Sequence, residues 1–282
     1  MRKNNRLPIK VGRRKVLAGS LAVGAVSAAG TKTLGSMNPE NLPPNIPDWT
    51  TYLGDGVDTT PYGMPSEFEN DVIRRNVEWL TATTESSVNF TPIQNLEGFV
   101  TPNGLCFERH HGGVAIINPQ DYRLMINGLV DREMIFSLED IKRFPQVNKF
   151  HFLECAANGG MEWRGAQLNG CQFTFGMIHN VQYTGVRIAD LIKETGLKPT
   201  AQWMLAEGSD SAGLTRSIPI EKALDDCIIA WAMNGEAMRP EQGYPARLVV
   251  PGWEGNMWIK WIRRIEFGDK PYMTREETSK YT

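Results

Sequence analysis

The sequence of 282 residues has few cysteines, no long apolar run and no recognisable phosphate loop. Its 4 cysteines form no Cys-x-x-Cys-His motif, so we expect no haem attached to this chain. The glycine-rich loops of Rossmann and P-loop folds are also missing, and no segment repeats. No apolar stretch reaches the about 20 residues that a membrane helix needs. The sequence therefore predicts no transmembrane segment in the mature protein.

Positive charge is scarce outside the N-terminus. Residues 1–15 contain seven Lys and Arg and no acid, and removing them from the net charge of −2 leaves −9. A nucleic-acid-binding protein needs a basic face that neutralises phosphates. The acidic body therefore argues against nucleic acid as a partner.

The N-terminus has the pattern of an export signal. Arg13 and Arg14 precede the apolar, small-residue run 16–29, and cleavage is expected around residues 27–30. Paired arginines in this place resemble a twin-arginine signal over residues 1–30. That pathway exports folded proteins, usually with a cofactor already inserted, so we expect a periplasmic protein. An ordinary secretory signal that happens to contain Arg-Arg is the alternative.

The remaining chain divides into an extended arm, residues 31–66, and a domain over residues 67–282. Apolar spacing predicts a helix at 67–80, and two short helices are expected near Ser137–Asp140 and over 187–194. Predicted strands cover 122–130, 149–154, 202–206, 227–233, 246–250 and 258–267, and Asn234-Gly235 indicates a hairpin turn. Strands outnumber helices without regular alternation, so we expect an α+β fold with mixed sheets.

The cysteines differ in their surroundings. Cys171 and Cys227 lie among apolar residues, which predicts buried thiols or a single bridge between them. Cys155 ends an apolar strand and enters the small-residue loop 156–160, so a large ligand could approach its sulfur. Such a thiolate suits a soft metal site. A structural cysteine is the alternative from composition alone.

Four segments in order resemble the sulfite oxidase family of molybdenum enzymes. They are Cys-Ala-Ala-Asn at 155–158, Cys-Phe-Glu-Arg-His-His at 106–111, the Gln-Gly-Tyr-Pro…Val-Pro-Gly-Trp-Glu-Gly stretch at 242–255, and Trp-Ile-Lys-Trp at 258–261. The resemblance covers roughly residues 95–282. Its details are nearest to the molybdenum subunit of bacterial Sox-type sulfane or sulfite dehydrogenases.

The resemblance implies a sulfite oxidase-type domain that binds molybdenum-molybdopterin through one cysteine thiolate. Cys155 matches the metal ligand, and Cys155, Arg109 and Tyr281 match catalytic positions. The expected cofactor-binding residues are Phe107, Glu108, Arg109, His110, His111, Cys155, Asp210, Gln242, Arg247, Trp258, Ile259 and Lys260. Arginine and lysine suit the pterin phosphate, because they offer bidentate and point-charge contacts.

Two departures from the family pattern shape the expected function. Gly160 stands where animal and plant members have an arginine five residues after the cysteine, so the site is less cationic and roomier. Family members continue into an immunoglobulin-like dimerisation domain where this sequence stops, at Thr282. We therefore expect that domain to be absent, and a homodimer to form only when it is present.

The leading hypothesis is a periplasmic oxidoreductase that oxidises sulfite or sulfane sulfur on a carrier protein. No haem domain precedes the molybdenum domain in this sequence, so the electrons are expected to leave to a partner c-type cytochrome. The alternatives are a molybdopterin reductase similar to methionine sulfoxide reductases, and an inactive cofactor-binding remnant or scaffold.

Overall fold

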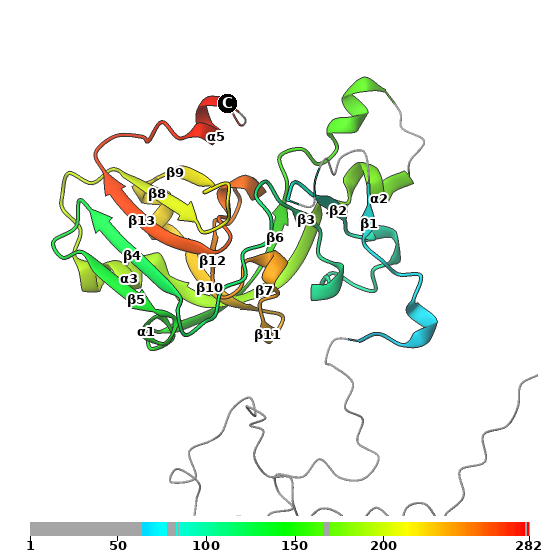
Figure 1. Cartoon of the computed structure of the whole chain (residues 1–282), viewed down its shortest axis with the longest axis horizontal. Coiled ribbons are helices and arrows are strands. Elements are labelled where there is room, and N and C mark those ends of the chain that lie inside the picture. The colour runs from blue at the N-terminus through cyan, green and yellow to red at the C-terminus, as the bar shows by residue number, and fades with distance from the viewer. Residues whose placement is uncertain (1–63, 78–82, 84, 166–169, 280, 282) are drawn as a thin grey trace, which may run out of the picture. The chain divides into compact units, whose positions relative to one another are not determined.

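The computed structural model describes residues 64–77, 83, 85–165, 170–279 and 281 (Figure 1). They fall within one structural unit, Pro61–Thr282. The predicted signal, 1–30, and residues 31–63 of the predicted arm lie outside the described residues.

The described strands form three sheets. The small sheet has the order β1-β2-β3, with β1 Arg75–Asn76, β2 Val88–Phe90 and β3 Glu108–Arg109. The second has the order β11-β10-β7-β6, and β12 also pairs with β10; its strands are β6 Gln146–Glu154, β7 Ile178–Arg187, β10 Ile228–Met233, β11 Glu236–Ala237 and β12 Arg247–Val249. The third has the order β5-β4-β13-β8-β9, with β4 Arg123–Gly128, β5 Met134–Ser137, β8 Trp203–Gly208, β9 Thr215–Pro219 and β13 Ile262–Gly268.

Strand pairing and short helices confirm the α+β class with mixed sheets. β4 and β13 run parallel, and the other named strand pairs are antiparallel. The α-helices are α1 Leu138–Lys142, α2 Gly170–Phe175, α3 Ile188–Thr195, α4 Ile220–Asp225 and α5 Arg275–Ser279. Side chains of both large sheets share one apolar core, in which Ile126 and Ile265 belong to the third sheet and Val181 and Ile229 to the second.

Most predicted elements are confirmed. The strand predictions at 122–130, 149–154, 202–206, 227–233 and 246–250 correspond to β4, β6, β8, β10 and β12. α1 begins with a capping box in which the Ser137 hydroxyl and the Asp140 carboxylate each accept from the other's backbone N–H. α3 ends at Gly196, whose φ of 68° suits a residue without a side chain. Asn234 and Gly235, both with positive φ, connect β10 to β11 as the hairpin prediction requires.

The helix predicted over 67–80 is wrong. Glu67–Glu69 forms one short 3-10 turn, and Arg75–Asn76 pairs with β2 instead of continuing a helix. Phe68 is 87% exposed and Ile73 57% exposed, so the described part of the segment has no buried helical face. The apolar residues of the segment do not share one buried face, since Phe68 and Ile73 are exposed whereas Val77 is buried in the core.

The predicted strand 258–267 begins four residues late. Trp261 has a φ of 49°, in the left-handed region, so extended pairing starts only at Ile262. Its indole N–H donates to the Pro240 carbonyl at 2.9 Å, which holds the unusual conformation. The segment before β13 is therefore a loop that faces the cavity described below.

All four cysteines are free thiols, so the alternative of a bridge between Cys171 and Cys227 is wrong. Cys171 is exposed on α2, in contrast to the predicted burial, because its neighbours Gln172 and Phe173 occupy the inward side of this short helix. Cys227 is buried as predicted, and burial raises the pKa of its thiol to about 12.

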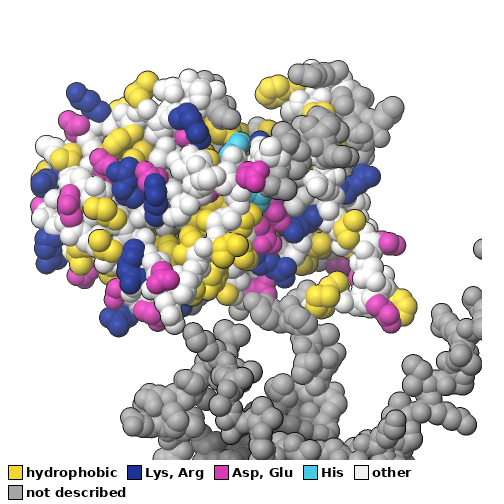
Figure 2. All heavy atoms as spheres, in the orientation of Figure 1, with side chains coloured by type: hydrophobic (Ala, Val, Ile, Leu, Met, Phe, Trp, Pro, Cys, Tyr) yellow, Lys and Arg dark blue, Asp and Glu magenta, His cyan; other side chains and the backbone are white. Residues whose placement is uncertain are grey.

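The described surface mixes charges of both signs, and Figure 2 shows Lys and Arg side chains interspersed with Asp and Glu on the face in view. Among the helices that the structure describes, none combines the length and apolar character required to span a bilayer.

Candidate functional site

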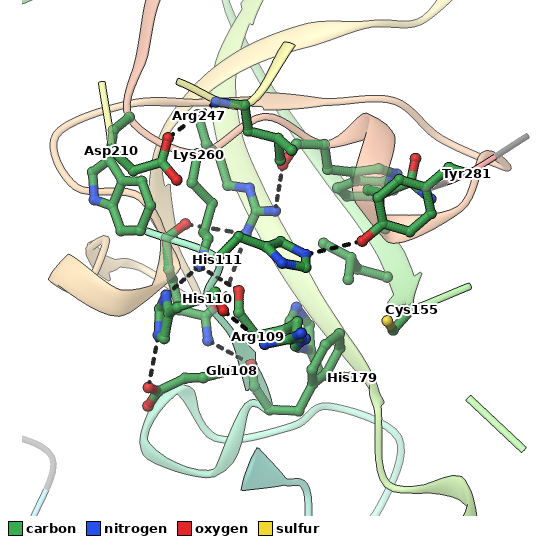
Figure 3. A pocket seen from close by; sticks show the side chains of 18 residues that line it. Glu108, Arg109, His110, His111, Cys155, His179, Asp210, Arg247, Lys260 and Tyr281 are labelled. Carbon is green, nitrogen blue, oxygen red and sulfur yellow. Dashed lines mark hydrogen bonds and ion pairs between the residues drawn. The ribbon is translucent and has the colours of Figure 1, made fainter. Parts of the chain in front are cut away.

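A cavity with about 710 Å³ of empty space, part of it open to solvent, lies where the three sheets and the C-terminal segment meet. Figure 3 shows that side chains from distant parts of the sequence point toward it. β3 and the residues after it supply Arg109 and His111, the loop after β6 supplies Cys155, β7 supplies His179, and β12 supplies Arg247. The fold therefore brings the ends of several strands to one site.

Cys155 lies directly after β6, at the rim of this cavity. Its backbone N–H donates to the Met177 carbonyl at 3.0 Å, and its carbonyl accepts from Asn158 N–H at 2.9 Å. Burial raises the pKa of the thiol, while the Ala157 N–H and the Arg109 charge oppose this rise. The raised pKa favours the protonated thiol, and a metal ion that binds the thiolate displaces the thiol proton. The environment therefore suits a metal ligand better than a free nucleophile.

Lys260 is the centre of a buried polar network on the opposite wall. Its Nζ donates to the carbonyl oxygens of Arg109 and Glu241, both at 3.1 Å, and lies 2.9 Å from His110 Nδ1. Burial and the nearby Arg247 lower the pKa of Lys260 well below its usual value. An anionic ligand would reverse part of this effect, because it favours the charged form.

His110 is held as a neutral imidazole in the same network. Its Nε2 lies 3.0 Å from a Glu108 carboxylate oxygen, while Nδ1 faces Lys260. Burial and the charge of Lys260 lower its pKa to about 3. The neutral ring therefore accepts a hydrogen bond at Nδ1 and donates one at Nε2.

Arg247 crosses the floor of the cavity and is 3% exposed. Its Nη1 and Nη2 donate to the carbonyl oxygens of Gln242 and Trp258, both at 3.1 Å. Gln242 in turn donates to the Phe107 carbonyl at 2.9 Å. These bonds fix two of the chain segments that surround the site.

Several buried polar atoms at the cavity have no hydrogen-bond partner within the described ranges. They are Nε of Arg247, Nδ1 of His179, and both Oδ1 and Nδ2 of Asn256. Buried polar atoms in native proteins are almost always paired, because an unpaired one costs about 1–3 kcal/mol. Their convergence on one cavity, beside the cations Arg247 and Lys260, fits an anionic ligand with several polar edges.

Tyr281 closes the cavity from the C-terminal side. Its hydroxyl lies 2.9 Å from His111 Nε2, and its backbone N–H donates to the Glu276 carbonyl at 2.9 Å. Burial, and next the nearby Cys155, raise the pKa of the phenol. Figure 3 shows the Tyr281 ring and the Cys155 sulfur on the same side of His111.

A second groove shares Cys155 and leads to the surface. Phe152, Glu154, Trp253 and Glu254 line it, and both carboxylates act to raise the pKa of Cys155. A side chain added at Gly160 would meet nothing within 4 Å, so the loop beyond Cys155 leaves open space. The described residues that line this groove include two aromatic rings and two carboxylates but no Lys or Arg.

The structure brings almost all of the predicted site residues together. The cavity is lined by Phe107, Glu108, Arg109, His110, His111, Cys155, Asp210, Gln242, Arg247, Trp258, Lys260 and Tyr281. Ile259 is the exception: its side chain is fully buried in the core, and its carbonyl accepts from Leu248 N–H at 2.8 Å. Asp210 lies beside the network, and its charge opposes the lowered pKa of Lys260.

Sequence reasoning missed two polar residues of the cavity, His179 and Asn256. Asn256 directly follows the segment 242–255 and could have been found from that adjacency. His179 lies on β7, a strand that was not predicted, although its buried and half-buried residues alternate as on a half-buried strand. Burial lowers the pKa of His179 to about 3, so it too is neutral.

Comparison with known proteins gives a family match and several relatives. The family model "Oxidoreductase molybdopterin binding domain" matches residues 111–276. Mitochondrial sulfite oxidase from Drosophila melanogaster is 34% identical over 183 residues, which are 62% of this chain and 32% of that protein. NADH nitrate reductase from Ulva prolifera is 31% identical over 189 residues, which are 62% of this chain and 22% of that protein.

A solved structure is more similar than these two relatives. The crystal structure of the sulfane dehydrogenase SoxCD from Paracoccus pantotrophus is 57% identical, with a TM-score of 0.78. The match covers 84% of this chain and 61% of that chain. This chain therefore spans a third or less of the two curated relatives and less than two thirds of the chain in the solved structure.

Proposed function

Because the chain belongs to the family of oxidoreductases with a molybdopterin-binding domain, we propose that it oxidises sulfur carried on a partner polypeptide. The observation that carries the proposal is the mouth of the site, where Cys155 opens into an apolar, acidic groove whose described lining residues include no Lys or Arg. The similarity to a sulfane dehydrogenase supports the same proposal.

The cofactor of this domain is molybdenum-molybdopterin, and the residues of the cavity fit it. Lys260, Arg247 and Arg109 offer the cations that a phosphate needs, and Asn256 and His179 offer unpaired buried polar atoms for the pterin edges. The Cys155 thiolate is the soft donor for the metal. When bound, the cofactor supplies a metal centre that takes two electrons from sulfur.

Tyr281, His111 and Arg109 are the residues placed to handle substrate and protons. The Tyr281 hydroxyl can hold a substrate oxygen while it exchanges a proton with His111 Nε2, 2.9 Å away. Arg109 has one Nη donating to the Ser87 and His110 carbonyl oxygens, which fixes its cation at the cavity wall. That positive charge stabilises an oxyanion as it forms.

The mouth favours a carrier-bound substrate over a free dianion. Glu154 and Glu254 would repel a small anion such as sulfite at this entrance. The exposed rings of Phe152 and Trp253, 55% and 37% exposed, offer an apolar surface to a polypeptide arm. A sulfur atom at the end of such an arm could pass between them toward Cys155.

The test compares substrates on the molybdenum-loaded protein. Reduction of a c-type cytochrome is followed with sulfite, with a peptide that carries a cysteine persulfide, and with buffer alone. We expect a higher kcat/KM for the peptide persulfide, and a rise in the sulfite kcat/KM in the double variant Glu154→Gln/Glu254→Gln. Equal kcat/KM values for both substrates, with no change in the double variant, would contradict the carrier-bound substrate. Turnover only of methionine sulfoxide with a reduced dye would instead establish a reductase.

We also propose that the protein is exported by the twin-arginine pathway and passes electrons to a c-type cytochrome. Arg13 and Arg14 support the export route. Replacing both by lysine keeps the charge but removes the guanidinium pair, so loaded protein should no longer reach the periplasm. Unchanged export of this variant would favour the ordinary secretory route.

A further inference from the structure

Arg216, on β9, is a buried cation outside the cavity lining. Its side chain is 6% exposed, and its Nη1 is buried without a hydrogen-bond partner among the residues the structure describes. Nε donates to the Met257 sulfur at 2.9 Å and lies 3.7 Å from the Glu277 carboxylate. A desolvated guanidinium is costly to keep, so its place needs a reason beyond packing.

Arg216 also contacts Tyr281. The guanidinium carbon of Arg216 lies 5.3 Å from the centre of the Tyr281 ring, within the range of a cation–π interaction. The hydroxyl of the same ring is fixed by His111 at 2.9 Å. Tyr281 is therefore held at two points, its ring by Arg216 and its hydroxyl by His111.

The β9 edge also fixes the backbone near Tyr281. Ser217 N–H donates to a Glu277 carboxylate oxygen at 2.6 Å, and the Thr215 hydroxyl donates to Glu276 at 3.4 Å. The Glu276 carbonyl accepts the Tyr281 N–H. Figure 1 shows α5, which carries both glutamates, close to β9. Arg216 thus adds a side-chain contact to a backbone that β9 already positions.

We propose that Arg216 is a positioning residue for Tyr281: it holds the phenol ring so that the hydroxyl meets the substrate oxygen and His111 together. The kinetic consequences of this proposal rest on the proposed sulfur oxidation.

A double-mutant cycle tests whether Arg216 acts through the hydroxyl. Arg216→Met should lower kcat by up to about 30-fold, because loss of the cation–π contact leaves the hydroxyl out of position more often by up to that factor. In the Tyr281→Phe background the same substitution should change kcat less than about twofold, because the group that Arg216 positions is already missing. Molybdenum content should stay at the wild-type level in all variants. Equal losses in both backgrounds would overturn the proposal.

Two further variants keep the cycle interpretable. Arg216→Lys retains a cation that can lie over the ring and should recover about tenfold of the lost kcat. If Arg216→Met does not fold, Arg216→Lys and Arg216→Gln replace it in the cycle. The glutamine variant should then lose more kcat than the lysine variant. Arg143, whose side chain is 79% exposed, provides the control. Arg143→Met should keep wild-type kcat and KM.

Nitration of tyrosine by tetranitromethane, mapped by peptide mass spectrometry on the loaded protein, gives a readout independent of turnover. Loss of a cation–π contact should expose Tyr281 about 2- to 30-fold more often, so its nitration should accelerate by a similar factor in Arg216→Met. Tyr122, buried with its hydroxyl donating to the Ile262 carbonyl at 2.7 Å, is the internal reference.

If wild-type protein oxidises no sulfur substrate, the proposed function fails while nitration still decides the role of Arg216. An unchanged nitration rate of Tyr281 would overturn that role.

Discussion

At the scale of single residues, the site depends on a few buried polar side chains that form defined hydrogen bonds within the protein instead of bonds to water. Arg247 and Lys260 are buried basic side chains, and each donates to two backbone carbonyls. These bonds hold three chain segments, but they leave positive charge facing the cavity. That combination makes a rigid site for an anion, because the cations are positioned before the ligand arrives.

Substituting Cys155 separates metal binding from folding. Cys155→Ser changes the size of the side chain little but removes the soft donor, so molybdenum content should fall by about tenfold or more while the unfolding midpoint stays near wild type. Metal content is measured by mass spectrometry of the purified protein. Cys171→Ser is the matched control, because Cys171 is exposed and outside the cavity. Full metal content in Cys155→Ser would contradict the assignment.

Substituting Arg247 should affect the pterin and the fold together. Arg247→Met leaves the carbonyls of Gln242 and Trp258 without donors, at about 1–3 kcal/mol each, and removes a cation from the site. We expect less pterin, assayed by fluorescence after release, and a lower denaturation midpoint. Arg263→Met, at a half-exposed position paired with Glu207, should change the free energy of unfolding by less than about 0.5 kcal/mol. Normal pterin content in Arg247→Met would show that this arginine does not hold the cofactor.

At the scale of elements, strand ends and short helices position the site. Cys155 lies immediately after β6, and Arg247 opens β12. α5 lies against β9, so the segment that carries Tyr281 covers an edge that would otherwise remain unpaired. A loop residue with positive φ, Trp261, delays β13, and the loop that this leaves carries Lys260 into the network.

The capping box of α1 gives a prediction at this scale. Ser137→Ala removes the hydroxyl that accepts the Asp140 N–H, at a cost of about 1 kcal/mol. The thermal midpoint should fall by about 2–4 °C, measured by circular dichroism, with unchanged metal content. Asp140→Asn keeps a polar side chain and should lose less. A drop in metal content with Ser137→Ala would mean that α1 supports the site more directly than its position indicates.

At the scale of the whole molecule, buried neutral histidines link stability to pH. An unfolded histidine has a pKa of about 6.5, whereas the pKa of folded His110 is lowered to about 3 by burial and Lys260. Between these values the unfolded chain binds the extra proton, so the free energy of unfolding decreases as the pH falls from about 6.5 toward 3. His179 acts in the same direction, because its pKa is also lowered to about 3.

The acid dependence can be assigned by substitution. Each of these histidines should contribute up to about 1.4 kcal/mol per pH unit below pH 6.5. Urea unfolding at pH 7.5, 6.0 and 5.0 should show a steep loss of stability in the wild type. His110→Asn keeps hydrogen-bonding atoms but cannot titrate. The pH dependence of its unfolding free energy should therefore correspond to the uptake of about one proton fewer on unfolding. An identical slope in the variant would assign the acid sensitivity to other groups.

The sequence by itself determined the features that depend on local pattern. The capping box at Ser137 and the Asn234-Gly235 turn are local, because their stabilising contacts lie within a few residues. The apolar pattern that marks the strands is also local, although the pairing that stabilises them is not. The segments around Cys155, Arg109 and Arg247 were likewise predicted as metal-binding and cofactor-binding segments from short motifs. The family resemblance and the expected cofactor rested on those motifs.

Only the tertiary structure decided what depends on contacts between distant segments. The helix predicted at 67–80 did not form, because amphipathic spacing stabilises a helix only where a core receives its apolar face. His179 and Asn256 became site residues because the fold buries the Nδ1 of His179 and both side-chain polar atoms of Asn256 without a partner among the described residues, a property that sequence spacing does not encode. Arg216 came to lie against Tyr281 through the packing of α5 on β9, 65 positions apart in the chain. Local sequence pattern indicates the type of an element, whereas long-range packing determines which groups each side chain of the site contacts.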